Sequence, residues 1–213
     1  MSEYGYIPEA PEQSFGNNKG IFTPKDIYDL TRADKYTNYG QLELIETQTA
    51  SSVSSINFTD IKEDIYNVHF LTFNNQLFAD DRQLAIKLYE NGSVSTNTYQ
   101  YALQYGTAGG TFNEARSTSL GELLISANAG GGGSDRERNN GYVYFYNLGD
   151  STKYSFVTFH NFILNSTSTG TMNFGSGVLP QASTVDGIQI IMRATGGTID
   201  EGDFSLYGIK EYS

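Results

Sequence analysis

The sequence contains no cysteine, no tryptophan and two histidines, His69 and His160. Without cysteine, the chain cannot form a disulfide scaffold, a thiol nucleophile or a cysteine-ligated zinc or iron–sulfur centre. Two histidines are also too few for a histidine-rich metal site. We therefore expect neither a bound metal nor a cofactor.

Basic residues are scarce as well: 13 Lys and Arg stand against 24 Asp and Glu, which gives a net charge of −11. Nucleic acids and anionic membranes attract clustered Lys and Arg, so we expect no nucleic-acid partner. Mean hydropathy is −0.40, and the chain lacks an apolar run of about 18 residues, so we expect no membrane insertion. The opening MSEYGYIPEA lacks the basic-then-apolar order of a signal peptide, which favours synthesis in a reducing cytoplasm.

Aromatic residues and glycine are abundant, with 16 Tyr, 13 Phe and 23 Gly. This composition is typical of half-buried strands joined by tight turns. From Leu42 onward the pattern predicts about ten or eleven strands and no βαβ unit. The predicted strands are 42–49, 55–61, 67–73, 84–92, 98–106, 120–127, 142–148, 154–164, 171–179, 188–194 and 204–212. We expect an all-β, jelly-roll-like antiparallel β-sandwich over residues 41–213.

The first 40 residues differ from the rest and hold three of the four prolines. Residues 4–19 show neither helical nor strand periodicity and read as an extended arm. A short helix should follow, with Thr23 as its N-cap, Pro24 at its first position and Asp26 in its first turn. The arm either folds back on its own domain or docks on a neighbouring subunit.

Two predicted strands are apolar on both faces: 142–148 (YVYFYNL) and 156–162 (FVTFHNF). One face must meet the sandwich core, so the other is available for a subunit interface. The alternative is that the tyrosine hydroxyls of the second face simply reach water.

No motif predicts catalysis. The glycine-rich segments 106–111 and 129–134 lack the Lys and the following helix of a phosphate-binding loop. Neither histidine accompanies a G-x-S-x-G motif, so each reads as a histidine with one polar partner on a sheet face. The carboxylates that could bind Ca²⁺ read more simply as solvated turns; they are Asp80, Asp81, Asp200, Glu201 and Asp203. We expect a protein that is not an enzyme and has no catalytic residue.

One polar loop, 129–140 (AGGGGSDRERNN), should be exposed because it offers no apolar side chain beyond Ala129. Its last residues could contact an anionic or glycan receptor on a host surface; they are Arg136, Arg138, Asn139 and Asn140. The alternative is an inert, disordered loop.

The order of several segments resembles a family of accessory virion proteins of tailed bacteriophages. The segments are Gln41–Ile61, with a Ser-rich turn between two strands, Ile86–Gly106, with a turn and an aromatic strand, and Gly196–Tyr212, with a strand ending in LYGI. The lead-in GIFTPKDIYDL also resembles this group. The resemblance implies a jelly-roll-like sandwich with a non-enzymatic structural place in the virion, as capsid decoration or as part of the tail or its fibres. It also implies a homotrimer and other virion proteins as partners.

Within that resemblance, residues 1–40 are expected to anchor the protein to the particle. The arm residues best able to bury apolar area are Ile7, Ile21, Phe22, Ile27, Tyr28 and Leu30. Two alternative functions remain open: a carbohydrate-binding module and, less favoured, a polysaccharide-degrading enzyme.

Overall fold

The computed structural model describes residues 13–14, 17–18, 23–33, 41–127, 136–164, 169–193 and 197–210. The chain divides into two compact units, residues 1–41 and residues 42–213.

The first unit contains a two-stranded ribbon and one helix. Strands β1 (Gln13–Ser14) and β2 (Asn17–Asn18) pair antiparallel, and helix α1 spans Pro24–Arg32. The backbone N–H of Asp26 donates to Thr23 Oγ1 (3.2 Å), while the backbone N–H of Thr23 donates to Asp26 Oδ2 (2.8 Å). This reciprocal capping box satisfies two donors that a helix start otherwise leaves unpaired. The predicted start of the helix is therefore confirmed.

The apolar residues of α1 stay accessible: Tyr28 is 64% exposed, and Ile27 and Leu30 are half-buried. The other expected anchor residues, Ile7, Ile21 and Phe22, lie outside the described part of the chain. The anchoring role of this segment stays a prediction.

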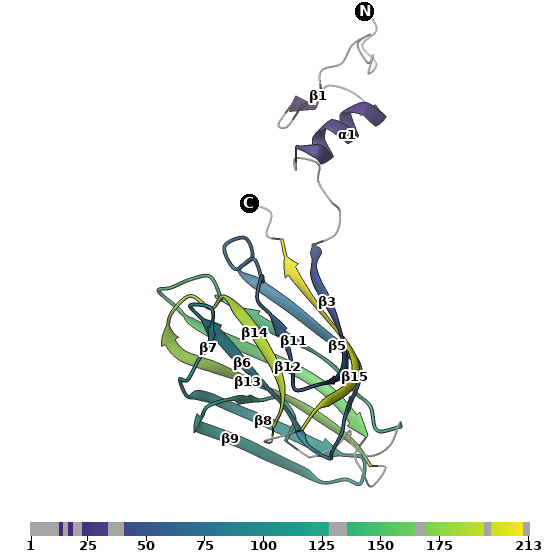
Figure 1. The fold of residues 1–213 in the computed structure, drawn as a ribbon, viewed down its shortest axis with the longest axis vertical. Coiled ribbons are helices and arrows are strands. Elements are labelled where there is room, and N and C mark those ends of the chain that lie inside the picture. The colour runs from purple at the N-terminus through teal and green to yellow at the C-terminus, as the bar shows by residue number, and fades with distance from the viewer. Residues whose placement is uncertain are drawn as a thin grey trace, which may run out of the picture. The chain divides into compact units, whose positions relative to one another are not determined.

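The second unit is an antiparallel β-sandwich, which confirms the expected all-β class (Figure 1). The long sheet has eight strands in the order β3-β15-β5-β11-β12-β13-β8-β9. The short sheet has five, in the order β10-β6-β14-β4, with β7 paired to β6. The strands are β3 (Leu42–Val53), β4 (Ser55–Phe58), β5 (Val68–Phe78), β6 (Gln83–Glu90), β7 (Ser93–Val94), β8 (Tyr99–Thr107), β9 (Phe112–Leu120), β10 (Leu123–Leu124), β11 (Asn139–Tyr146), β12 (Tyr154–Leu164), β13 (Gly170–Ala182), β14 (Gly187–Arg193) and β15 (Ile199–Ile209).

The core forms between the two sheets from alternate residues of each long strand. In β5, Leu71 and Phe73 are buried while Phe70 and Thr72 face outward. Residues facing one another across a ladder share a side of the sheet, so the same alternation runs through the neighbouring strands. The largest fully buried side chains include Phe58, Phe73, Phe78, Tyr99, Phe145 and Phe204.

Two inward asparagines also tie the long sheet to the segment that follows β10. Asn161 Nδ2 donates to the carbonyl of Ile125 (2.7 Å), and Asn173 Nδ2 donates to Asn161 Oδ1 (3.0 Å). The backbone N–H of Ala127 then donates to Asn173 Oδ1 (3.0 Å). Buried amides are tolerated because they find such partners. This segment holds the two-residue strand β10 instead of the predicted strand over 120–127, and Leu123, Leu124 and Ile125 are buried one after another.

Candidate functional site: the outer face of the long sheet

The outward side chains of the eight-stranded sheet form continuous rows across the strands. One row, read from paired residues, runs Tyr207, Phe70, Tyr144, Thr158, Ser176, Ala102, Arg116. Side-chain size falls abruptly along this row after Tyr144. The outer face therefore has two halves: an aromatic half over β15, β5 and β11, and a half over β13, β8 and β9 in which this row holds small residues, while the exposed Phe174 and Phe112 lie further along the strands.

We call the first half the aromatic face. It consists of the outward side chains of β3, β15, β5 and β11 together with two outward residues of β12. Its large members are Leu42, Leu44, Val68, Phe70, Tyr142, Tyr144, Tyr146, His160, Phe162, Tyr207 and Ile209. Several of these are well exposed, for example Leu44 at 56% and Phe162 at 54%.

The rings of the aromatic face contact one another. The Phe70 ring centroid lies 4.7 Å from that of Tyr144, 5.9 Å from Tyr142 and 6.2 Å from Tyr207. Tyr142 also meets His160 edge-to-face at 5.9 Å. Aromatic pairs at these separations add stability beyond the area they bury. The face is thus a packed layer of rings whose outer side is still accessible.

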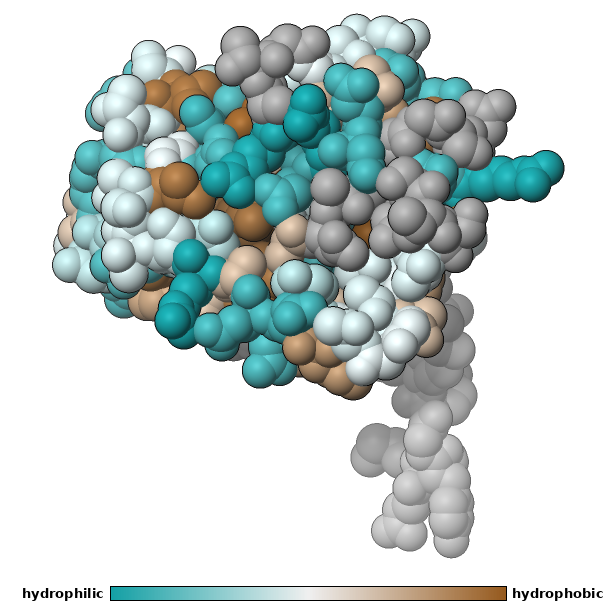
Figure 2. All heavy atoms as spheres, turned by 90° about the horizontal axis from the view of Figure 1, so that it is seen from below, coloured by the Kyte–Doolittle hydropathy of each residue, from teal (hydrophilic) through white to brown (hydrophobic). Residues whose placement is uncertain are grey.

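The aromatic face carries no Asp, Glu, Lys or Arg among the outward described residues of β5, β11 and β12 and residues 205–209 of β15. The residues that give the chain its net charge of −11 therefore lie outside these positions. The sandwich seen from below the view of Figure 1 differs accordingly: its surface is mostly hydrophilic or neutral, and hydrophobic residues show in small groups (Figure 2).

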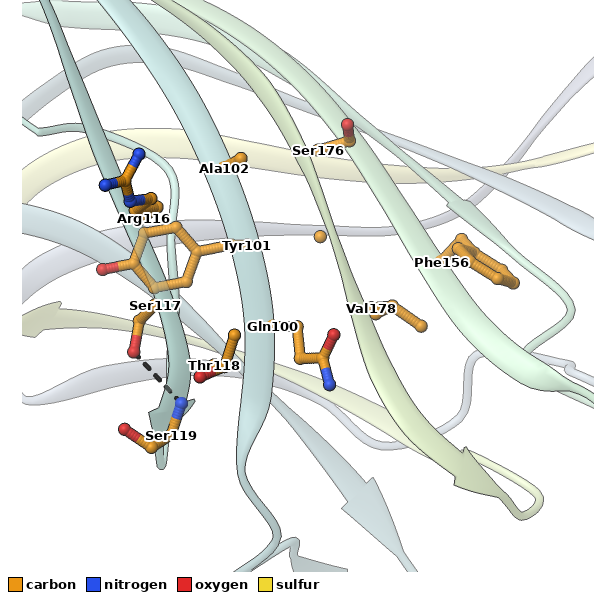
Figure 3. A pocket seen from close by; sticks show the side chains of 11 residues that line it. Gln100, Tyr101, Ala102, Arg116, Ser117, Thr118, Ser119, Phe156, Ser176 and Val178 are labelled. Atoms are coloured by element: carbon orange, nitrogen blue, oxygen red, sulfur yellow. Dashed lines mark hydrogen bonds between the residues drawn. The ribbon is translucent and has the colours of Figure 1, made fainter.

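The second half contains a hollow of about 710 Å³ over β8, β9 and β13 (Figure 3). Ala102 and Ser176 lie at its centre because small side chains occupy adjacent outward positions of β8 and β13. Phe156 of β12, 45% exposed, stands at one side of the hollow. Residues 116–119 of β9 line the opposite side.

The polar groups of the hollow are neutral or paired. Arg116 is salt-bridged to Glu114 with 2.6 Å between its Nη1 and Oε1, and both side chains are exposed. The Gln100 amide and the Thr118 and Ser176 hydroxyls make no hydrogen bond with the described residues. The hollow thus offers uncharged donors and acceptors that a ligand can use without breaking an existing bond.

A rigid interior lies beneath the hollow. Tyr99 of β8 is fully buried, and its hydroxyl oxygen accepts a hydrogen bond from the backbone N–H of Leu88 (2.8 Å). Burial raises the pKa of Tyr99 to about 12. Two inward positions of β13 are Gly175 and Gly177, where an added Cβ would lie 2.5 Å from the Ala102 carbonyl oxygen and from Leu123 Cδ1 respectively. A larger side chain at Gly175 or Gly177 would therefore clash with the neighbouring strand or with the short sheet.

The residues predicted to face a receptor are not brought together as an exposed loop. Asn139 and Asn140 belong to strand β11, and Asn139 is fully buried, so the prediction that Asn139 contacts a receptor is wrong. The Asn139 position pairs with Ile163, an inward residue, and therefore faces the core. Asn140 is exposed and accepts a hydrogen bond from the backbone N–H of Asn75. Arg138 is ion-paired with Glu201 (2.7 Å), and Arg136 is exposed.

The two histidines lie on opposite sides of the long sheet. His69 is buried, and its Nε2–H donates to the carbonyl of Ile61 (2.7 Å). Burial lowers the pKa of His69. His160 lies on the aromatic face. Neither contacts a serine hydroxyl or a carboxylate within the described part of the chain.

Three of the five carboxylates considered for calcium bind within the protein. Asp200 accepts from Thr198, Asp203 accepts from Thr49, and Glu201 pairs with Arg138. The described residues include no group of three or more His, Asp or Glu side chains that could hold a metal ion. No helix among them is long and apolar enough to cross a membrane.

Comparison with known proteins gives no family for this chain. No protein-family model matches it, and no curated protein matches it in sequence.

Sequence reasoning found the aromatic face but missed the hollow. The double-sided strands of β11 and β12 predicted an accessible aromatic layer, and the rings lie where that pattern placed them. Strand β9 (FNEARSTSL) was not predicted, because an exposed edge strand lacks apolar alternation. The available signal was the glycine-rich turn after β8 followed by the β-favouring residues Phe112 and Thr118.

Proposed function

We propose that this protein is a non-enzymatic structural protein of a tailed-phage virion, in which the sandwich assembles with copies of itself through the aromatic face. The observation that supports it is the packed, accessible layer of rings free of charged side chains. Exposed apolar surface of this kind is typical of protein interfaces. The virion assignment itself depends on the sequence resemblance.

The aromatic face provides a substantial part of the area that a stable contact needs. The four strands β3, β15, β5 and β11, about 4.8 Å apart and about 25 Å long, span on the order of 500 Å². Each partner of a standard protein interface contributes about 800 Å². The face therefore forms the centre of a contact that neighbouring surface completes.

A second copy of the same chain can be that partner in spite of its net charge. Two chains of net charge −11 repel each other at every contact that brings their acidic surfaces together. A contact through the aromatic face avoids this repulsion because the charged side chains of the chain lie outside the contact. We propose a trimer, the number implied by the resemblance, with residues 1–40 attaching it to other virion proteins.

The test is the oligomeric state of the full chain measured by light scattering at micromolar concentration. The wild type should give three times the 23.5 kDa of one chain. Tyr142→Glu should give the monomer mass, because it places a charge at the centre of the rings. Ile65→Glu is the matched control: Ile65 is 61% exposed but lies in the turn before β5, so its mass should equal that of the wild type.

A wild-type monomer, or equal masses for Tyr142→Glu and the wild type, would overturn the self-assembly proposal. The virion assignment is tested separately by quantifying the protein in purified particles by mass spectrometry. A chain lacking residues 1–39 should keep its oligomer mass and be missing from the particles. Finding no wild-type protein in the particles would overturn the virion assignment alone.

A further inference from the structure

The hollow over β8, β9 and β13 lies outside the aromatic face and its chemistry differs from that of a protein contact. We propose that it binds a short, uncharged oligosaccharide. This inference is independent of the proposed assembly, because it uses other residues of the sheet and a different ligand.

The uncharged polar groups of the hollow indicate the chemical class of its ligand. The Gln100 amide provides donors and an acceptor, and the hydroxyls of Thr118 and Ser176 provide both as well. None of the three is used by the described residues. A ligand with closely spaced hydroxyl groups can pair with all of them, and this is the chemistry of a sugar.

One wall of the hollow supplies an apolar surface of the right kind. The Phe156 ring is 45% exposed and stands across the hollow from β9. The C–H groups on one side of a pyranose ring form an apolar patch that can lie against an aromatic ring, while its hydroxyls point to the rim. Aromatic side chains combined with a few polar groups are typical of small-ligand sites.

The charges of the hollow and of the whole chain favour an uncharged oligosaccharide over an acidic one as the ligand. The one cation of the hollow, Arg116, is already paired with Glu114 at 2.6 Å. The chain as a whole is strongly acidic, which disfavours the approach of polyanions. An uncharged saccharide avoids this repulsion and can still accept hydrogen bonds from the guanidinium.

The volume and shape fit a few sugar residues. The hollow is open to solvent, and its volume of about 710 Å³ lies above the sheet, which suits a few sugar residues laid along the surface. The floor of small residues at Ala102 and Ser176 leaves room for a ring to approach the backbone.

The experiment measures binding of the full chain to an array of defined oligosaccharides of three to six residues. The probes are neutral oligomers of glucose, mannose, galactose and N-acetylglucosamine, with alginate and hyaluronate oligomers as acidic probes. We expect binding to at least one neutral series. In Phe156→Ala the dissociation constant should rise about tenfold or more, and in Gln100→Ala about threefold to tenfold.

Two matched controls come from the same sheet face outside the hollow. Phe174 has a similar exposure of 42% and lies on β13, and Gln104 is an exposed outward residue of β8. Phe174→Ala and Gln104→Ala should leave the dissociation constant within about twofold of the wild type. Thermal unfolding of each variant establishes that it is folded.

Three results would overturn the proposal: no neutral probe binds, acidic probes alone bind, or the control variants weaken binding as much as the hollow variants. Light scattering on the same samples keeps the two proposals apart. Phe156→Ala should lose saccharide binding and keep the wild-type oligomer mass. A loss of mass without a loss of binding would assign Phe156 to the assembly and overturn its role in saccharide binding.

Discussion

The two halves of the outer face differ in one property, the size of the side chains that the same ladder presents. On β5 and β11 the outward positions hold Phe70 and Tyr144, whose rings pack at 4.7 Å. Two strands further, on β13 and β8, the same row holds Ser176 and Ala102, and the surface is hollow. The backbone is continuous between them, so side-chain volume alone decides whether the sheet offers a layer for a protein or a recess for a small ligand.

The inner side of the sheet shows the same trend in side-chain size. Beneath the aromatic half, Val143 and Phe145 fill the core, whereas β13 beneath the hollow half has Gly175 and Gly177. At Gly177 the short sheet comes close through Leu123. The hollow half is therefore constrained from below, and the aromatic half is stabilised by contacts on both sides.

The largest effect should come from breaking that constraint. In Gly177→Val the new side chain would meet Leu123 Cδ1 at 2.5 Å and the Gln100 carbonyl at 2.9 Å, both inside the core. We expect the free energy of unfolding to fall by about 3 kcal/mol, as in overpacked cores. Urea denaturation measures it. Ser176→Val, one residue away but outward, should change it by less than about 0.5 kcal/mol; equal losses in the two variants would show that the inner side is not constrained.

The second-largest effect should be a loss of folding stability at high pH, caused by Tyr99 beneath the hollow. Because burial raises the pKa of Tyr99 to about 12, the folded state holds this proton more tightly than the unfolded chain, where the pKa is near 10. The contribution of protonated Tyr99 to the free energy of unfolding is complete below pH 10 and is lost as the pH rises toward 12. The expected loss is on the order of 2–3 kcal/mol.

Tyr99→Phe isolates this contribution. The variant is less stable at pH 8, because the Leu88 N–H loses its acceptor. The stability gap between wild type and variant should narrow from pH 10 to pH 12 in urea titrations. Tyr154→Phe, at a 47% exposed tyrosine, should run parallel to the wild type over this range. A gap that stays constant for Tyr99→Phe would contradict the argument.

A smaller effect should distinguish the aromatic half from the hollow half directly. Phe70→Ala removes three ring contacts and should lower the free energy of unfolding by about 2 kcal/mol. Val178→Ala, on the outward side of β13, should cost roughly 0.5 kcal/mol because it removes few contacts. Similar losses in both would mean that the ring layer contributes no stability of its own.

Local chemistry fixed several features in advance. The capping residues Thr23, Pro24 and Asp26 determined the start of α1, since a capping box depends on residues that are neighbours in sequence. The Asn91–Gly92 pair, with φ of 55° and 71°, forms the turn after β6, as Asn-Gly pairs favour. The alternation in β11 and β12 likewise determined that each strand has two large faces.

What remained undetermined depends on which strands become neighbours. The sequence by itself placed Tyr142, Phe70 and Tyr207 on strands, and pairing of β11, β5 and β15 brought their rings together. It did not reveal that Asn139 lies inside, because a polar residue at a strand end reads as a loop until its partners Gln76 and Ile163 are known. The hollow needed three strands to place Phe156, Ser176, Ala102 and Thr118 around one space. Local sequence thus determined the helix, the turns and the alternation, while the surfaces available for function arose from long-range strand order, which local propensity does not encode.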